Sequence, residues 1–277
     1  MALTAANGPF SRHPVGRFNL EIDRSRAVLF WEPVPQRVRA LVADETIADS
    51  KRMLLLHETG HLPVYYFPQD DIRSDLVEQS EHTTRCPHKG TARYWSVRVG
   101  DRQVPNAIWA YPEPLESASF LAGYVALDWD SFDEWFVEDE QAFGHPRDPY
   151  ARIDVYSTTR HVRVLRDGVV LADSRRAKVL FETVLPPRYY FPADDVRTEL
   201  LEPSSTKSRC AYKGSASYWH VRVGDRLVED LVWSYPDPQH DGEPVRDLFC
   251  FFNERVDLEL DGEVQERPQT QYSRDDD

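Results

Sequence analysis

Short stretches of alternating apolar and polar residues run along most of the chain and predict strands. The stretch YWSVRV at 94–99 alternates in this way and then meets Gly-Asp at 100–101. Alternation with a period of two places Trp95, Val97 and Val99 on one face of a strand and the side chains between them on the other. A Gly-Asp pair between two such runs predicts a β-hairpin with a tight turn.

Other segments give the same picture. HVRVLRDGVVLADS at 161–174 predicts a second kind of hairpin, with Asp-Gly as its turn, and KVLFET at 178–183 predicts a further strand. DDIRSDL at 70–76 places acidic residues first and a leucine one turn later, which favours a short helical turn. The stretch at 80–90 is rich in turn residues and is expected to be a loop. Since no amphipathic helix of ordinary length is found, the fold class is mainly β, with few short helical turns.

The chain repeats itself with a shift of 124 residues. RCPHKG at 85–90 returns as RCAYKG at 209–214, and residues 37–114 align without a gap to 161–238, with about half of the pairs identical. Such similarity predicts two tandem homologous antiparallel β domains. We place the first copy at 18–142, the second at 150–266, and a loose C-terminal tail at 267–277.

The blocks that recur are ADS, ET, YYFP, RC with KG, YW, and a W-x-YP ending. In this set and order the chain resembles the bacterial family described as domain of unknown function 427, here in tandem. The resemblance implies a small, mostly antiparallel domain in each copy, similar in outline to the β-tent arrangement. Some β-tent families hold zinc with paired cysteines, but this chain has no C-x-x-C, so we expect neither a metal nor another cofactor.

The composition of the chain limits the kinds of partner and compartment that are expected. The chain has 33 Lys+Arg against 47 Asp+Glu, a formal charge of −14 that repels a phosphate backbone, so no nucleic acid partner is expected. Three cysteines, Cys86, Cys210 and Cys250, are an odd set that suits a reducing compartment. No apolar run has the length of a membrane span and the first residues lack a secretory h-region, which predicts a cytoplasmic protein without membrane contact.

The repeated cysteine lies between two basic residues. Arg85 and Lys89 flank Cys86, and positive charge favours the thiolate form of a neighbouring cysteine. One interpretation is a reactive thiol or an anion-binding loop. The other is that the cysteine is a small buried apolar residue and that Lys89-Gly90 forms an exposed turn. His82 is a candidate base in the first copy alone, because the second copy has Thr206 there.

Adjacent aromatic residues suggest a pocket. Tyr94 and Trp95 must point to opposite faces of their strand, so one ring leaves the main core and can line a concave site beside the lysine. We therefore expect a module that binds a small anionic or planar ligand in each copy. The candidate ligand-binding residues are Arg85, Lys89, Tyr94 and Trp109, matched by Arg209, Lys213, Tyr218 and Trp233.

Two other classes stay open. One is an enzyme that uses Cys86 or Cys210 on a small molecule, with His82 assisting in the first copy. The other is a scaffold whose aromatic surface meets another protein.

The repeated carboxylates, including Glu58 and Glu182 of the ET block, have structural explanations. Asp and Ser of ADS suit a turn between strands. Glu78 and Glu202 are expected to form ion pairs with Arg73 and Arg197 rather than acid–base couples.

Overall fold

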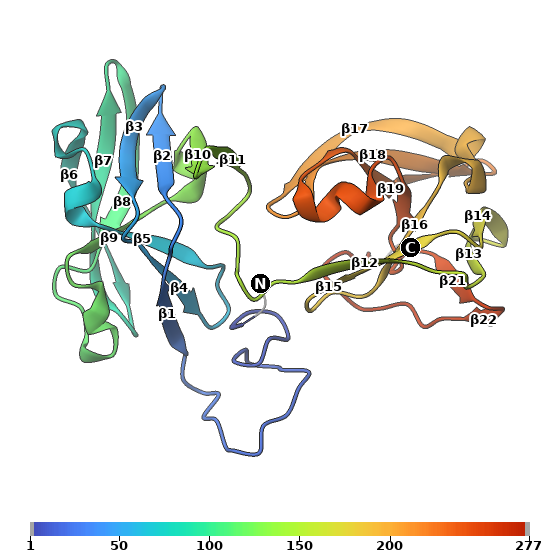
Figure 1. Ribbon diagram of the computed structural model, residues 1–277, viewed down its shortest axis with the longest axis horizontal. Coiled ribbons are helices and arrows are strands. Elements are labelled where there is room, and N and C mark those ends of the chain that lie inside the picture. Colours follow the sequence, from blue (N-terminus) through green and yellow to red (C-terminus); the bar gives the residue numbers. More distant parts are fainter. Residues whose placement is uncertain (1–2, 275–277) are drawn as a thin grey trace. The chain divides into compact units, whose positions relative to one another are not determined.

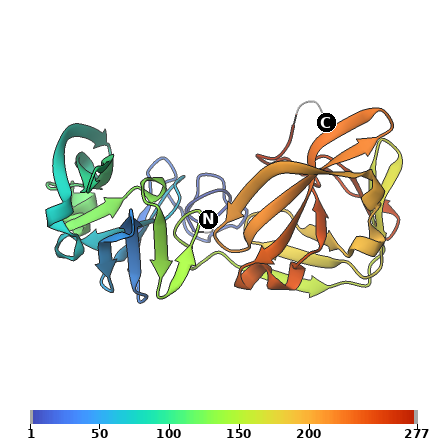
Figure 2. The same ribbon diagram turned by 90° about the horizontal axis from the view of Figure 1, so that it is seen from above.

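The protein is described by a computed structural model that covers residues 3–274. The chain divides into two compact units, Met1–Tyr150 and Ala151–Asp277 (Figures 1 and 2). Each unit is mainly β and contains two antiparallel sheets with only short 3-10 turns between strands. The fold class predicted from the sequence is thereby confirmed.

The first unit consists of a seven-stranded sheet and a four-stranded sheet. The order in the larger sheet is β1-β4-β5-β9-β8-β7-β6, and in the smaller one β11-β10-β2-β3. The strands are β1 (Leu29–Pro33), β2 (Val38–Val42), β3 (Glu45–Ser50), β4 (Leu54–Glu58), β5 (Val64–Pro68), β6 (Val77–Cys86), β7 (Gly90–Val99), β8 (Arg102–Ala110), β9 (Tyr124–Leu127), β10 (Glu134–Val137) and β11 (Glu140–Ala142).

The second unit repeats this topology strand for strand. Its larger sheet has the order β12-β15-β16-β20-β19-β18-β17 and its smaller one β14-β13-β21-β22. The long strands β17, β18 and β19 lie side by side in Figure 1. The strands are β12 (Ile153–Ser157), β13 (Val162–Arg166), β14 (Val169–Ser174), β15 (Lys178–Glu182), β16 (Arg188–Phe191), β17 (Leu201–Cys210), β18 (Gly214–Val223), β19 (Arg226–Pro238), β20 (Phe249–Phe251), β21 (Asp257–Leu260) and β22 (Glu263–Val264).

Strand register extends the equivalence beyond the segment that the sequences match. Tyr66 pairs with Ala126, and Tyr190 pairs with Cys250, so the shift of 124 residues also relates β9 to β20. Just after these strands, the amide of Asp128 donates to the Ala107 carbonyl, and the amide of Phe252 donates to the Leu231 carbonyl. Asp128 and Phe252 are therefore equivalent positions.

The predicted local elements are found. β7 and β8 form a hairpin, with Gly100 at φ +55 in its turn, where a glycine adopts the left-handed region without a steric penalty. The ADS strand pairs with its neighbour in the hairpin β13–β14. The segment after YYFP contains two 3-10 turns, Gln69–Asp71 and Ser74–Leu76, as its acidic residues and leucine predict.

Each unit has apolar clusters on both faces of its larger sheet. In the first unit Phe67, Val97 and Trp135 belong to one cluster, whereas Tyr66 and Leu121 belong to the other. Neighbours in a strand point to opposite faces, which is why the adjacent rings of YYFP and YW are divided in this way. The 3-10 segment Glu116–Leu121 covers part of the second face. The candidate site lies on that second face.

Glu78 and Glu202 form ion pairs, but the predicted partners Arg73 and Arg197 are wrong. Arg98 donates to Glu78 at 3.2 Å, because β6 and β7 place the two residues across neighbouring strands. Arg73 instead binds Asp75, two residues further along the chain. The second unit has the same arrangement, with Glu202 bound by Arg222 and Arg197 bound by Glu199.

The ADS block is the end of a strand in each unit, and its serine holds the turn that follows. The Arg52 amide donates to the Ser50 hydroxyl at 3.0 Å, and the Arg176 amide donates to the Ser174 hydroxyl at the same distance. The expected loop at 80–90 is largely strand, because β6 continues to Cys86 and only three residues separate it from β7. The turn-forming composition of this strand reflects its exposed position at the sheet edge.

Candidate ligand-binding site

A buried ion pair joins the two most specific repeated blocks of the first unit. Glu58 ends β4, Lys89 lies in the turn before β7, and the Lys89 ammonium donates to the Glu58 carboxylate. Each residue is only 8% exposed, so Lys89-Gly90 is not the exposed turn considered above. The ammonium also lies 5.8 Å from the centre of the Tyr111 ring, within the range of a cation–π interaction. Because both charges are removed from water, loss of either residue would leave the other as an uncompensated buried charge.

A cavity of about 290 Å³ opens above this pair. Its walls are aromatic and apolar side chains from β4, β5, β7 and β8, and the Cys86 thiol lies among them. The lining residues are Leu56, Glu58, His61, Leu62, Val64, Tyr66, Cys86, Lys89, Tyr94, Trp109 and Tyr111.

Two tyrosines of the pocket, Tyr66 and Tyr111, have raised pKa values. Burial raises the pKa of Tyr66 above its ordinary value, and the hydrogen bond with Trp109 only partly opposes this effect. Burial also raises the pKa of Tyr111, with the charges of Cys86 and Glu58 acting in the same direction. Phenols with raised pKa values stay protonated near neutral pH, so they can both donate and accept hydrogen bonds.

The structure brings together three of the four ligand-binding residues predicted in this copy. Lys89, Tyr94 and Trp109 line the cavity, whereas Arg85 is exposed and is not among the lining residues. The predicted catalytic candidates are separated. The ring of His82 packs 4.6 Å from the Tyr94 ring, and His82 precedes Cys86 by four residues of strand β6, on the order of 10 Å.

The second unit contains the same ion pair. Lys213 donates to Glu182, and both have equivalents in the first unit. Burial by itself lowers the pKa of Lys213, but Cys210 and Glu182 outweigh burial and raise it. Tyr218 shares a hydrogen bond of 2.8 Å with Ser208. Of the eleven positions that line the first cavity, eight carry the same residue in the second unit; these are Leu180, Glu182, Tyr190, Cys210, Lys213, Tyr218, Trp233 and Tyr235.

The three differences all fall at the connection between the fourth and fifth strands of each unit. His61, Leu62 and Val64 are replaced by Leu185, Pro186 and Arg188. The last replacement matters most, because it exchanges a short apolar side chain for a long cationic one.

Arg188 is held over the aromatic residues of the second unit. Its guanidinium carbon lies 5.6 Å from the centre of the Trp233 ring and 5.8 Å from that of Phe252. Glu254 accepts two hydrogen bonds of 2.7 Å from the guanidinium group, a bidentate pair. Trp233 is 6% exposed, whereas Trp109 is partly exposed. The space above this tryptophan is thus filled in the second unit by side chains of the chain itself.

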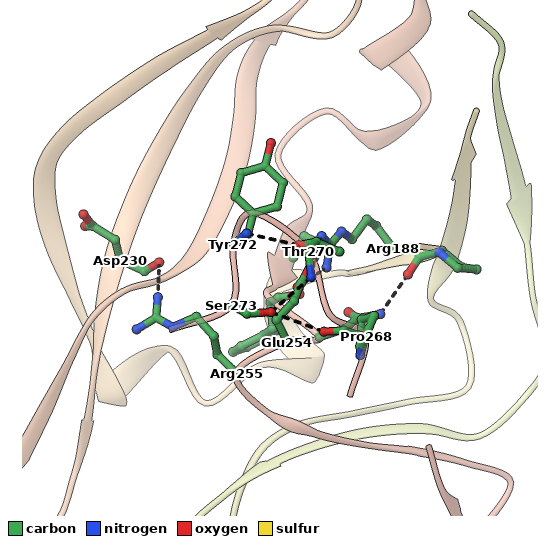
Figure 3. A network of polar contacts seen from close by, with 12 residues as sticks. Arg188, Asp230, Glu254, Arg255, Pro268, Thr270, Tyr272 and Ser273 are labelled. Carbon is green, nitrogen blue, oxygen red and sulfur yellow. Dashed lines mark hydrogen bonds and ion pairs between the residues drawn. The ribbon is translucent and has the colours of Figure 1, made fainter. Parts of the chain in front are cut away.

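The C-terminal segment completes this cover. Thr270 donates to Glu254 at 2.6 Å, and the ring of Tyr272 packs 5.4 Å from that of Phe252 and 5.9 Å from the Arg188 guanidinium (Figure 3). Thr270 and Tyr272, which belong to the segment expected as a loose tail, thus contact the second unit. Residues 275–277 of the predicted tail lie outside the described residues.

Several residues of the site were missed by sequence reasoning. Glu58 was assigned a structural role, although its presence in both copies 31 residues before the repeated lysine was a usable signal. Tyr66 and Tyr111 were recognised only as repeated aromatic residues. No repeat could reveal Arg188 and Glu254, because the first copy has neither.

Residues 30–138 and 154–262 each match the model of the family described as domain of unknown function DUF427. These matches cover most of the chain, which therefore belongs to this family as a tandem member. A comparison with curated proteins gives no match. Within residues 3–274, no helix is long and apolar enough to cross a membrane, and no three His, Cys, Asp or Glu side chains are grouped as metal ligands would be.

Proposed function

We propose that the first unit binds a small planar ligand in the cavity above the Glu58–Lys89 pair. The observation that carries the proposal is a cavity of about 290 Å³ with rings for walls and a buried ion pair at its base. Known ligand sites are concave and mostly apolar, with a few placed polar groups that fix orientation. This volume is at the small end of their range, so a single substituted ring is the appropriate size.

Planarity has better support than negative charge. The charge of Lys89 is balanced by Glu58, so an anion in the cavity would find no uncompensated cation there. A flat ring, by contrast, can stack on Trp109 or Tyr94 and place its polar edge toward the tyrosine hydroxyls. The proposal concerns the first unit, because Arg188 and the rings around it take up the corresponding space in the second.

A matched pair of probes tests planarity. Isothermal titration calorimetry of the full chain with benzamide and with cyclohexanecarboxamide compares a flat ring with a puckered one that carries the same amide. We expect benzamide to bind more tightly and to lose binding in Leu62→Trp, which fills the cavity. Leu20→Trp, at a position 59% exposed and away from the cavity, is the control and should bind like the unmodified chain.

The outcomes are decisive for the proposal. Equal binding of the two amides would remove the argument for a planar ligand. Failure of benzamide and of its charged analogues benzoate and benzamidine to bind at all would contradict a ligand site in this cavity.

A further inference from the structure

The two units offer an internal comparison of an open site with a filled one. Because eight of the eleven lining residues, Trp109 among them, are identical in the two units, the group that fills the site in the second unit indicates what the open site can hold. That group is the guanidinium of Arg188, which stands where the first unit has Val64. This comparison rests on the proposed function, since it treats the first cavity as a ligand site.

In the filled site the planar cation of Arg188 has two kinds of partner, aromatic rings and a carboxylate. The guanidinium lies over the Trp233 and Phe252 rings, and Tyr272 approaches it from the C-terminal segment. Rings attract cations through their negative faces, and guanidinium groups also stack on them. Glu254, whose side chain is fully buried, balances the positive charge.

The first unit keeps the tryptophan and changes what stands around it. Val64 is too short to reach over Trp109, so the cavity is open. Asp128 occupies the position of Phe252, two residues after Ala126 and on the same face of the strand as Ala126 and Trp109. The first unit thus has a carboxylate at the position where the second unit has a ring over its tryptophan.

The charges of the first unit therefore suit a cation. Glu58 and Lys89 balance one another, so Lys89 offers no uncompensated positive charge to a ligand, and the exposed Asp128 carboxylate, which accepts a hydrogen bond from Ser131, is an anion at the position equivalent to Phe252. The formal charge of −14 for the whole chain also raises the local concentration of cations at its surface.

We infer that the cavity of the first unit binds a planar cation, a ligand with a guanidinium or amidinium group that stacks on Trp109 as Arg188 stacks on Trp233. Such a ligand supplies from outside the group that the second unit carries on its own chain. Stacking and the nearby carboxylate then select it over neutral and anionic ligands of equal shape.

Three probes of the same shape and different charge test the inference. Benzamidine is a planar cation, benzamide is neutral and benzoate is an anion. In titrations of the full chain at neutral pH, we expect benzamidine to bind about tenfold more tightly than benzamide, and benzoate to bind most weakly. Tighter binding of benzamide or benzoate would overturn the inference while leaving the proposed ligand site in place. If none of the three binds, the proposed function itself fails.

Single substitutions test whether benzamidine binds in the cavity of the first unit. Val64→Arg gives the first unit the residue that fills the second, and we expect it to abolish benzamidine binding. Val15→Arg adds the same charge at a position 80% exposed and should leave binding unchanged. Asp128→Asn should weaken benzamidine several-fold and leave benzamide unaffected, a readout that does not depend on how well Val64→Arg folds. Unchanged benzamidine binding in Asp128→Asn, or in a folded Val64→Arg, would contradict the inference.

Discussion

Replacing Lys89 with methionine isolates the energetic role of the buried ion pair. The variant keeps an unbranched chain of similar length but leaves the Glu58 carboxylate, 8% exposed, without its cation. Breaking a buried pair by removing one partner costs about 3–5 kcal/mol, because the remaining charge stays desolvated. For a unit of this size, each kcal/mol shifts the melting temperature by about 2–4 °C, so we expect the first unit to melt on the order of 10 °C lower.

Differential scanning calorimetry of the full chain measures this shift. The second unit contains no part of the altered pair, so its transition is an internal reference. Lys213→Met is the matched variant and should move the other transition. The double variant Lys89→Met with Glu58→Met removes both charges and should recover most of the loss, since an apolar pair of similar volume is often as stable as a buried ion pair.

The reasoning would be refuted by either of two results. A cost below about 1 kcal/mol for Lys89→Met would show that the pair is solvated and behaves like a surface ion pair. A double variant whose loss equals the sum of the two single losses would show that the two charges do not interact.

Three further predictions concern other parts of the chain. Burial raises the pKa of Glu254, but the hydrogen bonds from Arg188 outweigh burial and lower this pKa. The stability that the pair gives is therefore present above about pH 4.5 and is lost as the pH falls through the lowered pKa. Thermal melts from pH 7 to 3 should show this loss, and Glu254→Gln should make the melting temperature less dependent on pH. Burial raises the pKa of Cys250, so mass spectrometry after iodoacetamide treatment of the folded protein should find Cys86 labelled and Cys250 unlabelled. In Gly214→Ala the new methyl would meet backbone atoms at 2.8 and 2.9 Å at a φ of +91, so urea unfolding should show a loss of about 2 kcal/mol or more, and an unchanged midpoint would contradict this.

The parts of the fold that depend on local pattern could be predicted from the sequence. Alternation around Trp95 gave the strand and its two faces, and Gly-Asp gave the hairpin, because both are properties of neighbouring residues. The repeat added the number of domains. The continuation of β6 to Cys86 was missed, because an exposed edge strand has the polar composition of a loop.

The site was predicted only in part, for a physical reason. Lys89, Tyr94 and Trp109 were found because they recur, but their common cavity depends on strands far apart in the sequence. The pairing of Glu58 with Lys89 needs β4 and the turn before β7 to meet, which no local pattern encodes. The filled site of the second unit depends on Arg188 together with Phe252, Glu254 and Tyr272, which lie far apart in the sequence and meet only in the fold.

The apolar clusters of each unit are built from that unit's residues alone. A mutation that loosens the apolar core of one unit is therefore expected to leave the core of the other unit intact. Separate cores allow the two copies of a duplicated domain to diverge independently, and the difference between Val64 and Arg188 is one such divergence.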